Sequence, residues 1–383
     1  MKRRILAISL VLLLAISLAA IGCGPKEGVE QQAEDPYEEY VASLPGGSFP
    51  VSPECFGQAI EEGELLIYEW PDWWPEEVYE GFSEEFGIKI TRDAYATAAE
   101  VRTKFALAPE TPFDLVCAMG IEDVISLSKV GAAGPINPDW APNVWKYVPG
   151  KYLELASKYS SVAYHLFFTA YMYNTNYVDD PRIPSWGVLL EPEEQFKGKI
   201  TLLDDQFMVV GSALKYLGYS FYSDNEEELM EAEELLMKLK PYVMEYSTWP
   251  LALVKEDEAL IVHMWSGDGW FMHDEYEAIL PVLPSEGADL GVGLIFHPVG
   301  SPNPAAAHLF VNYLFRPEVN AFLIEKIFYP PTHTAVLGLL PEELLPVVTV
   351  PEGYSDKCDP FDPRGVTGEG LKIRTKIWEE LKS

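Results

Sequence analysis

Tryptophan and aspartate recur in this sequence where short apolar runs end, and side chains of these two types could bind a ligand together. Three such stretches are Trp70-Pro71-Asp72-Trp73-Trp74, Asp204-Asp205 and Trp265-Ser266-Gly267-Asp268. An indole face attracts an ammonium group by about 0.5–2 kcal/mol, and a carboxylate accepts charge-assisted hydrogen bonds from the same group. The combination predicts a pocket for an organic cation.

The alternative role for these indoles is packing in the core or at its rim. We favour packing for Trp74. For Trp70, Trp73 and Trp265 the position directly after an apolar run favours a pocket.

Motifs of the common enzyme classes are missing from the sequence. None of the six histidines forms an HExxH pair, and no GxxxxGK[ST] or GxSxG turn occurs. Gly291-Val292-Gly293 lacks the further glycine of a dinucleotide loop. A glycosidase-type acid pair stays open, because carboxylates are abundant. We expect a binding protein with no catalytic residues, no cofactor and no metal site.

Apolar runs of strand length alternate with amphipathic stretches, and these elements must position the candidate residues. Strands are expected at residues 65–68, 88–90, 113–117, 199–203 and 259–264, and helices at 75–86, 207–217, 224–240, 305–315, 319–328 and 371–381. This order predicts parallel sheets covered by helices, in two α/β lobes. Ligands of such sheets bind beyond the carboxyl ends of the strands, where the tryptophan and aspartate residues fall.

Length and charge limit the possible partners. The 383 residues, 48% of them hydrophobic, are enough for two domains with sizeable cores. The 27 Lys and Arg against 60 Asp and Glu give a formal net charge of −33. A phosphate backbone would be repelled, so nucleic acid is excluded as a partner. The charge suits a cationic small molecule, although a solvated acidic surface produces the same number.

The N-terminus predicts export. Lys2, Arg3 and Arg4 precede an apolar run at residues 5–21, and Cys23 follows directly. This arrangement resembles a bacterial lipoprotein signal, with residues 1–22 removed and Cys23 lipidated. A plain signal peptide or an uncleaved anchor are the alternatives. Residues 23–60, acidic and interrupted by Gly and Pro, are interpreted as a tether between membrane and globule.

Three further cysteines remain for an oxidising compartment. Cys117 lies in an apolar run and is expected to be buried in a strand. Cys55 and Cys358 flank the folded part of the chain, so we expect a disulfide between them.

Short sequence blocks spread from about Leu65 to Leu381 resemble the spermidine/putrescine-binding proteins of bacterial polyamine ABC transporters. The blocks include Leu66-Ile67-Tyr68-Glu69-Trp70, Phe113-Asp114-Leu115-Val116, Leu203-Asp204-Asp205, Trp265-Ser266-Gly267-Asp268, Phe310-Val311-Asn312-Tyr313 and Tyr329-Pro330. The resemblance implies a type 2 periplasmic-binding fold, in which two lobes, each a mixed sheet flanked by helices, close over a ligand. Lobe 1 would hold residues 61–168 and 292–337, and lobe 2 residues 169–291 and 338–383.

The resemblance also implies the roles of six site residues. Trp70, Trp73, Trp265 and Tyr329 would form the walls of the pocket, and Asp205 and Asp268 would bind ammonium groups.

Five positions depart from the family pattern. Met208 replaces an amine-binding glutamate, Gly291 and Gly293 replace a Trp and a ligating Asp, and Met119 and Ile121 replace a Ser and a Tyr. An ammonium buried without its carboxylate costs several kcal/mol. Either Asp289 substitutes, or the ligand carries fewer charges, or the ligand is not a polyamine.

The sequence as a whole predicts a monomeric, lipid-anchored solute receptor of an ABC importer, exported to the periplasm or cell exterior and serving a membrane permease. A polyamine such as putrescine or spermidine is the expected ligand. The alternatives are a less cationic solute on the same scaffold, or an enzyme or protein-interaction module that uses the cleft.

Overall fold

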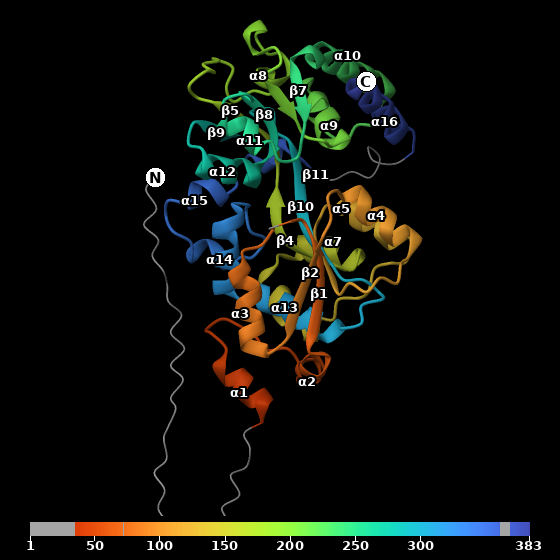
Figure 1. The fold of residues 1–383 in the computed structure, drawn as a ribbon, viewed down its shortest axis with the longest axis vertical. Coiled ribbons are helices and arrows are strands. Elements are labelled where there is room, and N and C mark those ends of the chain that lie inside the picture. Colours follow the sequence, from red (N-terminus) through yellow and green to blue (C-terminus); the bar gives the residue numbers. More distant parts are fainter. Residues whose placement is uncertain (1–34, 72, 361–367) are drawn as a thin grey trace, which may run out of the picture.

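The apolar runs of the sequence form two β-sheets, one in each of two lobes (Figure 1). The computed structural model describes residues 35–71, 73–360 and 368–383. The lobe 1 sheet has the order β11-β10-β3-β1-β2, and β4 also pairs with β10. Its strands are β1 (Glu64–Glu69), β2 (Lys89–Ala94), β3 (Leu115–Met119), β4 (Ser161–Phe167), β10 (Asp289–Phe296) and β11 (Asp359–Pro360).

The lobe 2 sheet has the order β7-β6-β8-β5-β9. Its strands are β5 (Thr169–Asn174), β6 (Ile200–Leu202), β7 (Val243–Tyr246), β8 (Ile261–Trp265) and β9 (Ile279–Val282). Both sheets are mixed. In lobe 1, β1 pairs in parallel with β2 and β3, while β10 runs antiparallel to β3 and β4. In lobe 2, β6 pairs in parallel with β7 and β8, while β5 runs antiparallel to β8 and β9. The predicted fold class, two α/β lobes with a mixed sheet in each, is confirmed.

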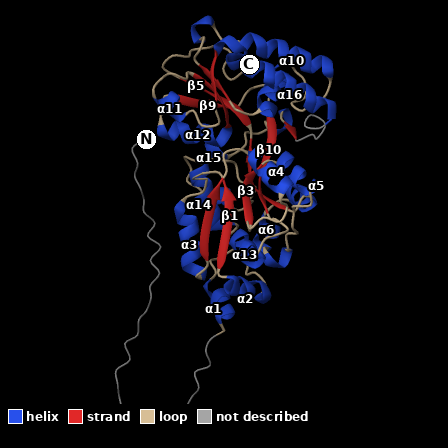
Figure 2. Cartoon of the chain, turned by 45° about the vertical axis from the view of Figure 1, so that its right-hand side comes forward, coloured by secondary structure: helices blue, strands red, loops and turns tan. Residues whose placement is uncertain are grey.

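Helices flank the strands of each lobe (Figure 2). The elements up to β4 include α1 (Pro36–Ser43), α2 (Pro53–Glu62), α3 (Glu76–Phe86), α4 (Ala98–Leu107), α5 (Ile121–Lys129), α6 (Pro142–Tyr147) and α7 (Gly150–Lys158). Between β5 and β9 lie α8 (Gly187–Leu190), α9 (Gln206–Tyr216), α10 (Glu226–Leu239), α11 (Leu251–Lys255) and α12 (Ser266–Glu275). After β10 follow α13 (Pro304–Leu314), α14 (Pro317–Ile327), α15 (Leu345–Val348) and α16 (Gly368–Lys382).

The chain passes between the lobes three times: after β4, along β10 and after α15. It leaves lobe 1 after β4, and Phe168 is the first residue buried in the core of lobe 2. It returns along β10, which pairs with β4 from Gly291 onward. Leu340 and Val348 are buried in the lobe 1 core, so the expectation that residues 338–348 belong to lobe 2 was wrong.

The acidic segment before β1 is folded where the structure describes it. Tyr40 of α1 stacks on Phe56 of α2 with ring centroids 4.8 Å apart, and Cys55 and Ala59 are fully buried. The expected tether is therefore wrong for residues 35–60. The acidic residues do not prevent structure, because Asp35 caps the N-terminus of α1 and other acids lie in its first turn, where the helix dipole favours negative charge.

The signal peptide and Cys23 fall outside the described residues. None of the described helices is long and apolar enough to cross a membrane.

The expected Cys55–Cys358 disulfide does not form. Cys55 is buried in the core of lobe 1 and Cys358 in the core of lobe 2, and both are free thiols. The prediction failed because position near the two ends of the folded sequence carries no information on distance in space. Cys117 is a free, buried residue of β3, as the sequence predicted.

Candidate functional site

Three of the predicted site residues meet where the two lobes touch. Tyr329, which follows α14 of lobe 1, donates its hydroxyl to Asp268 Oδ1 of lobe 2 at 2.7 Å. The Trp73 ring lies 5.9 Å from the Tyr329 ring, and its Nε1 donates to the Tyr164 hydroxyl at 2.6 Å. An aromatic wall from one lobe therefore faces a carboxylate from the other.

The glycine in the motif around Asp268 makes this contact possible. Asp268 lies in the first turn of α12, which begins directly after β8. A Cβ atom on Gly267 would lie 2.3 Å from the Tyr329 ring. Only glycine therefore allows the tyrosine to approach α12 closely enough to reach the carboxylate. The sequence showed this glycine beside two candidate residues, but its packing partner is 62 positions away and could not be inferred.

The other tryptophans divide between the site and the cores. Trp265, at the end of β8, is partly buried and packs against the cores of both lobes. Trp70 packs on Tyr95 with ring centroids 4.8 Å apart, beside the carboxyl end of β1. Trp74 is 2% exposed in the lobe 1 core, where its ring meets Tyr164 edge-on. The preference for core packing at Trp74 is confirmed.

Asp205 has a structural role that the sequence did not reveal. It caps the N-terminus of α9, and its Oδ1 accepts hydrogen bonds from the backbone N–H groups of Phe207 at 2.8 Å and Met208 at 3.2 Å. Burial raises the pKa of Asp205, and the negative charge of Asp123 from lobe 1 raises it further. Asp205 therefore does lie at the interlobe junction, with one oxygen already engaged by its own helix.

A second acidic group from lobe 1 faces Asp205. Asp123, in the first turn of α5, is ion-paired with Arg102 of α4. The adjacent Glu122 has its pKa raised to about 8, first by burial and then by the charge of Asp123, and Asp205 contributes. The Arg102 guanidinium thus acts on all three carboxyl groups, because its positive charge opposes in part the rise in the pKa of each. Sequence reasoning missed Glu122 and Arg102, although the acidic start of α5 follows the β3 strand end that the crevice rule indicates.

The Asp268 carboxyl group is held in an unfavourable environment for its charge. Burial raises the pKa of Asp268 to about 7, and the hydrogen bond from Tyr329 opposes this only in part. A cation placed beside this carboxyl group would stabilise the ionised form.

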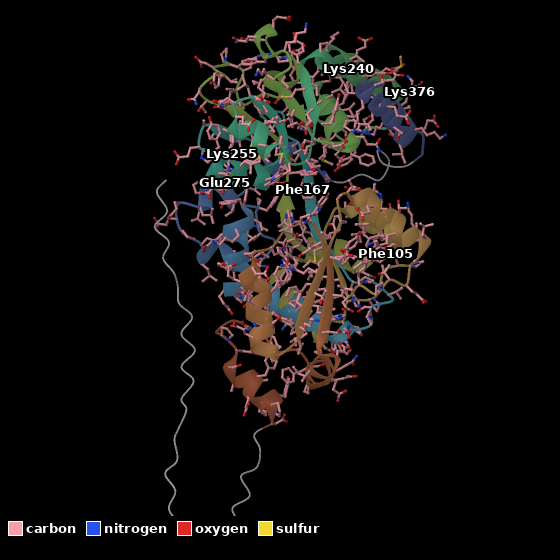
Figure 3. The ribbon with its side chains drawn as sticks, in the orientation of Figure 1. Phe105, Phe167, Lys240, Lys255, Glu275 and Lys376 are labelled. Carbon is pink, nitrogen blue, oxygen red and sulfur yellow. The ribbon has the colours of Figure 1, made fainter. Side chains whose placement is uncertain are left out.

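The two glycines that depart from the family pattern make room for rings from the neighbouring strand. On the antiparallel β4–β10 pair, Gly291 lies opposite Phe167 and Gly293 opposite His165. A Cβ atom would lie 2.2 Å from the Phe167 ring at Gly291 and 2.0 Å from His165 Nε2 at Gly293. Phe167 lies where the lobes meet (Figure 3). Aromatic side chains of β4 thus occupy the space over β10.

Met208, a further departure, lies beside the first crossing of the chain between the lobes. Met208 is buried and its sulfur accepts a hydrogen bond from Thr169 Oγ1 at 3.0 Å. Asp289 accepts the Thr169 backbone N–H at 2.6 Å, while its Oδ2 is buried without a hydrogen-bond partner among the described residues. Burial raises the pKa of Asp289 to about 6. Ile121 is buried at the start of α5, and the Met119 side chain lies outside the described part of the chain.

Cavities lie near the site and within lobe 1. One of about 80 Å³ is lined by Phe168, Trp270 and Pro330 among others, and one of about 130 Å³ lies within lobe 1 near Trp145. Within residues 35–71, 73–360 and 368–383, no group of His, Cys, Asp or Glu is arranged to hold a metal ion.

The chain is similar to known proteins over most of its length. Residues 77–342 match a family model described as bacterial extracellular solute-binding protein. The putrescine-binding periplasmic protein SpuD of Pseudomonas aeruginosa is 25% identical over 348 residues, which cover 85% of this chain and 94% of that protein. The spermidine/putrescine-binding periplasmic protein of Salmonella typhimurium is 28% identical over 290 residues, which cover 75% of this chain and 82% of that protein. The family resemblance found in the sequence is confirmed.

Solved structures share the fold at lower identity. The TpPotD lipoprotein of Treponema pallidum superimposes with a TM-score of 0.73 at 18% identity, covering 83% of this chain and 99% of that one. The binding protein MotA of A. tumefaciens, solved with glucopine, gives a TM-score of 0.69 at 18% identity, and the match covers 84% of this chain and 100% of that one.

Proposed function

Because this chain belongs to the bacterial extracellular solute-binding proteins, we propose that it captures a cationic small molecule between its lobes for an ABC importer. The observation that carries the proposal is the meeting of Trp73 and Tyr329 from lobe 1 with Asp268 from lobe 2. The aromatic rings would cover the methylene groups of a ligand, and the carboxylate would bind its ammonium group. No chemistry is performed on the ligand.

Asp268 would bind the ligand through the oxygen that Tyr329 leaves available. The tyrosine hydroxyl donates to Oδ1 only, so Oδ2 is the acceptor for a ligand N–H. Asp205, on the lobe 2 side of the junction, adds a carboxyl group near the site. Glu122, on the lobe 1 side, has a pKa raised to about 8 and would ionise when a cation binds beside it. Trp265 borders both cores and would close the side of the site, with Trp70 at its lobe 1 rim.

Closure of the lobes would present both of their surfaces to the permease. The strand crossings at Phe168 and β10, together with the third crossing after α15, form the hinge of the proposed motion. A ligand shifts the equilibrium toward the closed form by its differential affinity for that form.

Putrescine or spermidine is the first ligand class proposed, since both are named for the relatives. A less cationic solute is the second candidate, and Met208, Gly291 and Gly293 favour it because none of them supplies a carboxylate. Export by residues 1–22, lipidation at Cys23 and a monomeric state complete the proposal.

The test is calorimetric titration with putrescine and spermidine. Asp268→Asn should weaken binding by at least about tenfold, because the variant keeps the shape but loses the counter-charge. The matched control is Asp204→Asn, which changes an exposed acid of the same lobe that pairs with Lys382. Equal affinities of Asp268→Asn and wild type would refute the assignment of Asp268. An absence of heat with either amine at millimolar concentration would refute the polyamine proposal.

A further inference from the structure

His165 of β4 carries a ring nitrogen that has no partner in the protein. The side chain is 3% exposed, and its Nδ1 lies 3.1 Å from the Leu166 carbonyl oxygen. A carbonyl only accepts, so Nδ1 carries the hydrogen and Nε2 presents a lone pair. Nε2 is buried and has no hydrogen-bond partner among the described residues. A buried acceptor in this state costs free energy unless something else bonds to it.

The backbone of β10 is shaped around this nitrogen. A Cβ atom on Gly293 would lie 2.0 Å from His165 Nε2, so any other residue at position 293 would displace the imidazole. His165 and Gly293 face each other in the strand pairing. His165 and Gly293 are therefore coupled: the imidazole of β4 occupies the space that a side chain at position 293 of β10 would need.

The imidazole lies beside the proposed ammonium site. Its ring centroid is 4.6 Å from that of Tyr329 and 5.9 Å from that of Trp73. Tyr329 in turn donates its hydroxyl to Asp268. A ligand that binds Asp268 over these rings would therefore extend toward Nε2. Burial lowers the pKa of His165 to about 4, so the imidazole is neutral at pH 7 and acts as an uncharged acceptor.

We propose that His165 determines ligand specificity, with Nε2 accepting a hydrogen bond from an uncharged N–H or O–H group of an amine whose ammonium binds Asp268. This inference rests on the proposed function and narrows its substrate class. A neutral acceptor fully satisfies a buried hydroxyl or amide donor, but it supplies no counter-charge for a second ammonium group. The ligand would thus carry one positive charge at the Asp268 end and a neutral donor at the His165 end.

The test compares three amines with the same four-carbon chain by calorimetric titration. Putrescine ends in a second ammonium group, 4-amino-1-butanol in a hydroxyl group and butylamine in a methyl group. The wild type should bind 4-amino-1-butanol about tenfold more tightly than butylamine, and no more weakly than putrescine. His165→Phe keeps a ring but removes the acceptor. The affinity of this variant for 4-amino-1-butanol should therefore fall to its affinity for butylamine.

Two further variants and a control make the test specific. His165→Gln keeps an acceptor and should retain the preference for the alcohol. The double variant His165→Ser with Gly293→Asp exchanges the imidazole for a carboxylate on β10 and should favour putrescine by about tenfold. The control is His297→Phe, which changes another buried histidine of lobe 1, bonded to the Asp114 carbonyl. It should preserve the wild-type order of the three amines.

The outcomes separate this inference from the proposed function. If putrescine binds through Asp268 but His165→Phe leaves the ratio of alcohol to butylamine unchanged, the inference is overturned and the function stands. If none of the three amines binds the wild type, both are overturned. A folded His165→Gln that behaves like His165→Phe would also contradict the role of Nε2 as acceptor.

Discussion

At the scale of single residues, the proposed site depends on the Asp268 carboxyl group, which lies beside Tyr329 and has no ion-pair partner among the described residues. Within the described part of the chain, the Asp268 side chain accepts one hydrogen bond, from Tyr329, and burial raises its pKa to about 7. An arrangement built only for stability would pair this acid with a lysine or arginine. In a site that binds a cation, the ligand's own ammonium group supplies the positive charge that pairs with this acid.

Ligand binding should therefore release protons at neutral pH. A cation beside Asp268 stabilises its ionised form and lowers its pKa below about 7. Protonated carboxyl groups must then ionise on binding, and affinity should fall as pH is lowered through this pKa. Titrations with putrescine at pH 7 in phosphate and in Tris measure this release, because the two buffers differ in ionisation enthalpy.

The control for this effect is Asp268→Asn, in which the difference between the buffers should shrink. It need not vanish, because Glu122 and Asp289 also have raised pKa values, to about 8 and about 6. If Asp268→Asn releases as many protons on binding as the wild type, Asp268 is not the group whose ionisation is linked to ligand binding.

At the scale of elements, two helices ahead of the first strand belong to lobe 1. Tyr40 of α1 stacks on Phe56 of α2 and meets Phe86 of α3 edge-on. Pro36 and Pro53 each occupy the first position of their helix, where proline is well tolerated. Residues 35–60, predicted to be a tether, therefore form helices that pack on lobe 1.

Truncating this aromatic contact should destabilise the protein. Phe56→Ala should lower the free energy of unfolding by about 3 kcal/mol, through loss of buried apolar surface and the cavity left behind. Urea denaturation measures the change. Glu61→Ala, an exposed position on the same helix, is the control and should stay within about 0.5 kcal/mol of wild type. No effect of Phe56→Ala would restore the interpretation of the segment as a tether.

Local patterns predicted elements well and long-range partners poorly. The apolar spacing of Val78, Phe82 and Phe86 and the stop at Gly87 predicted α3, because each signal lies within one helix. The placement of His165 over Gly293 could not be predicted, because it depends on two strands more than a hundred residues apart. The strand-end rule selected Trp73, Asp268 and Trp265 as candidates, since it needs only the end of one strand.

At the scale of the whole molecule, the proposed function depends on two lobes with separate cores that meet at one candidate site. Each lobe has its own hydrophobic cluster, and Trp265 and Leu290 are among the few side chains that pack against both. A net charge of −33 favours solubility and attracts cations to the molecule. Because the lobes are joined at strand crossings, a ligand that contacts both can hold them together.

The most direct test of this account is a crystal structure of the protein grown with putrescine or 4-amino-1-butanol. We expect electron density for the ligand between the Trp73 and Tyr329 rings, with its ammonium nitrogen within hydrogen-bond distance of Asp268. Density elsewhere on the protein, or a ligand that touches residues of one lobe only, would contradict the account.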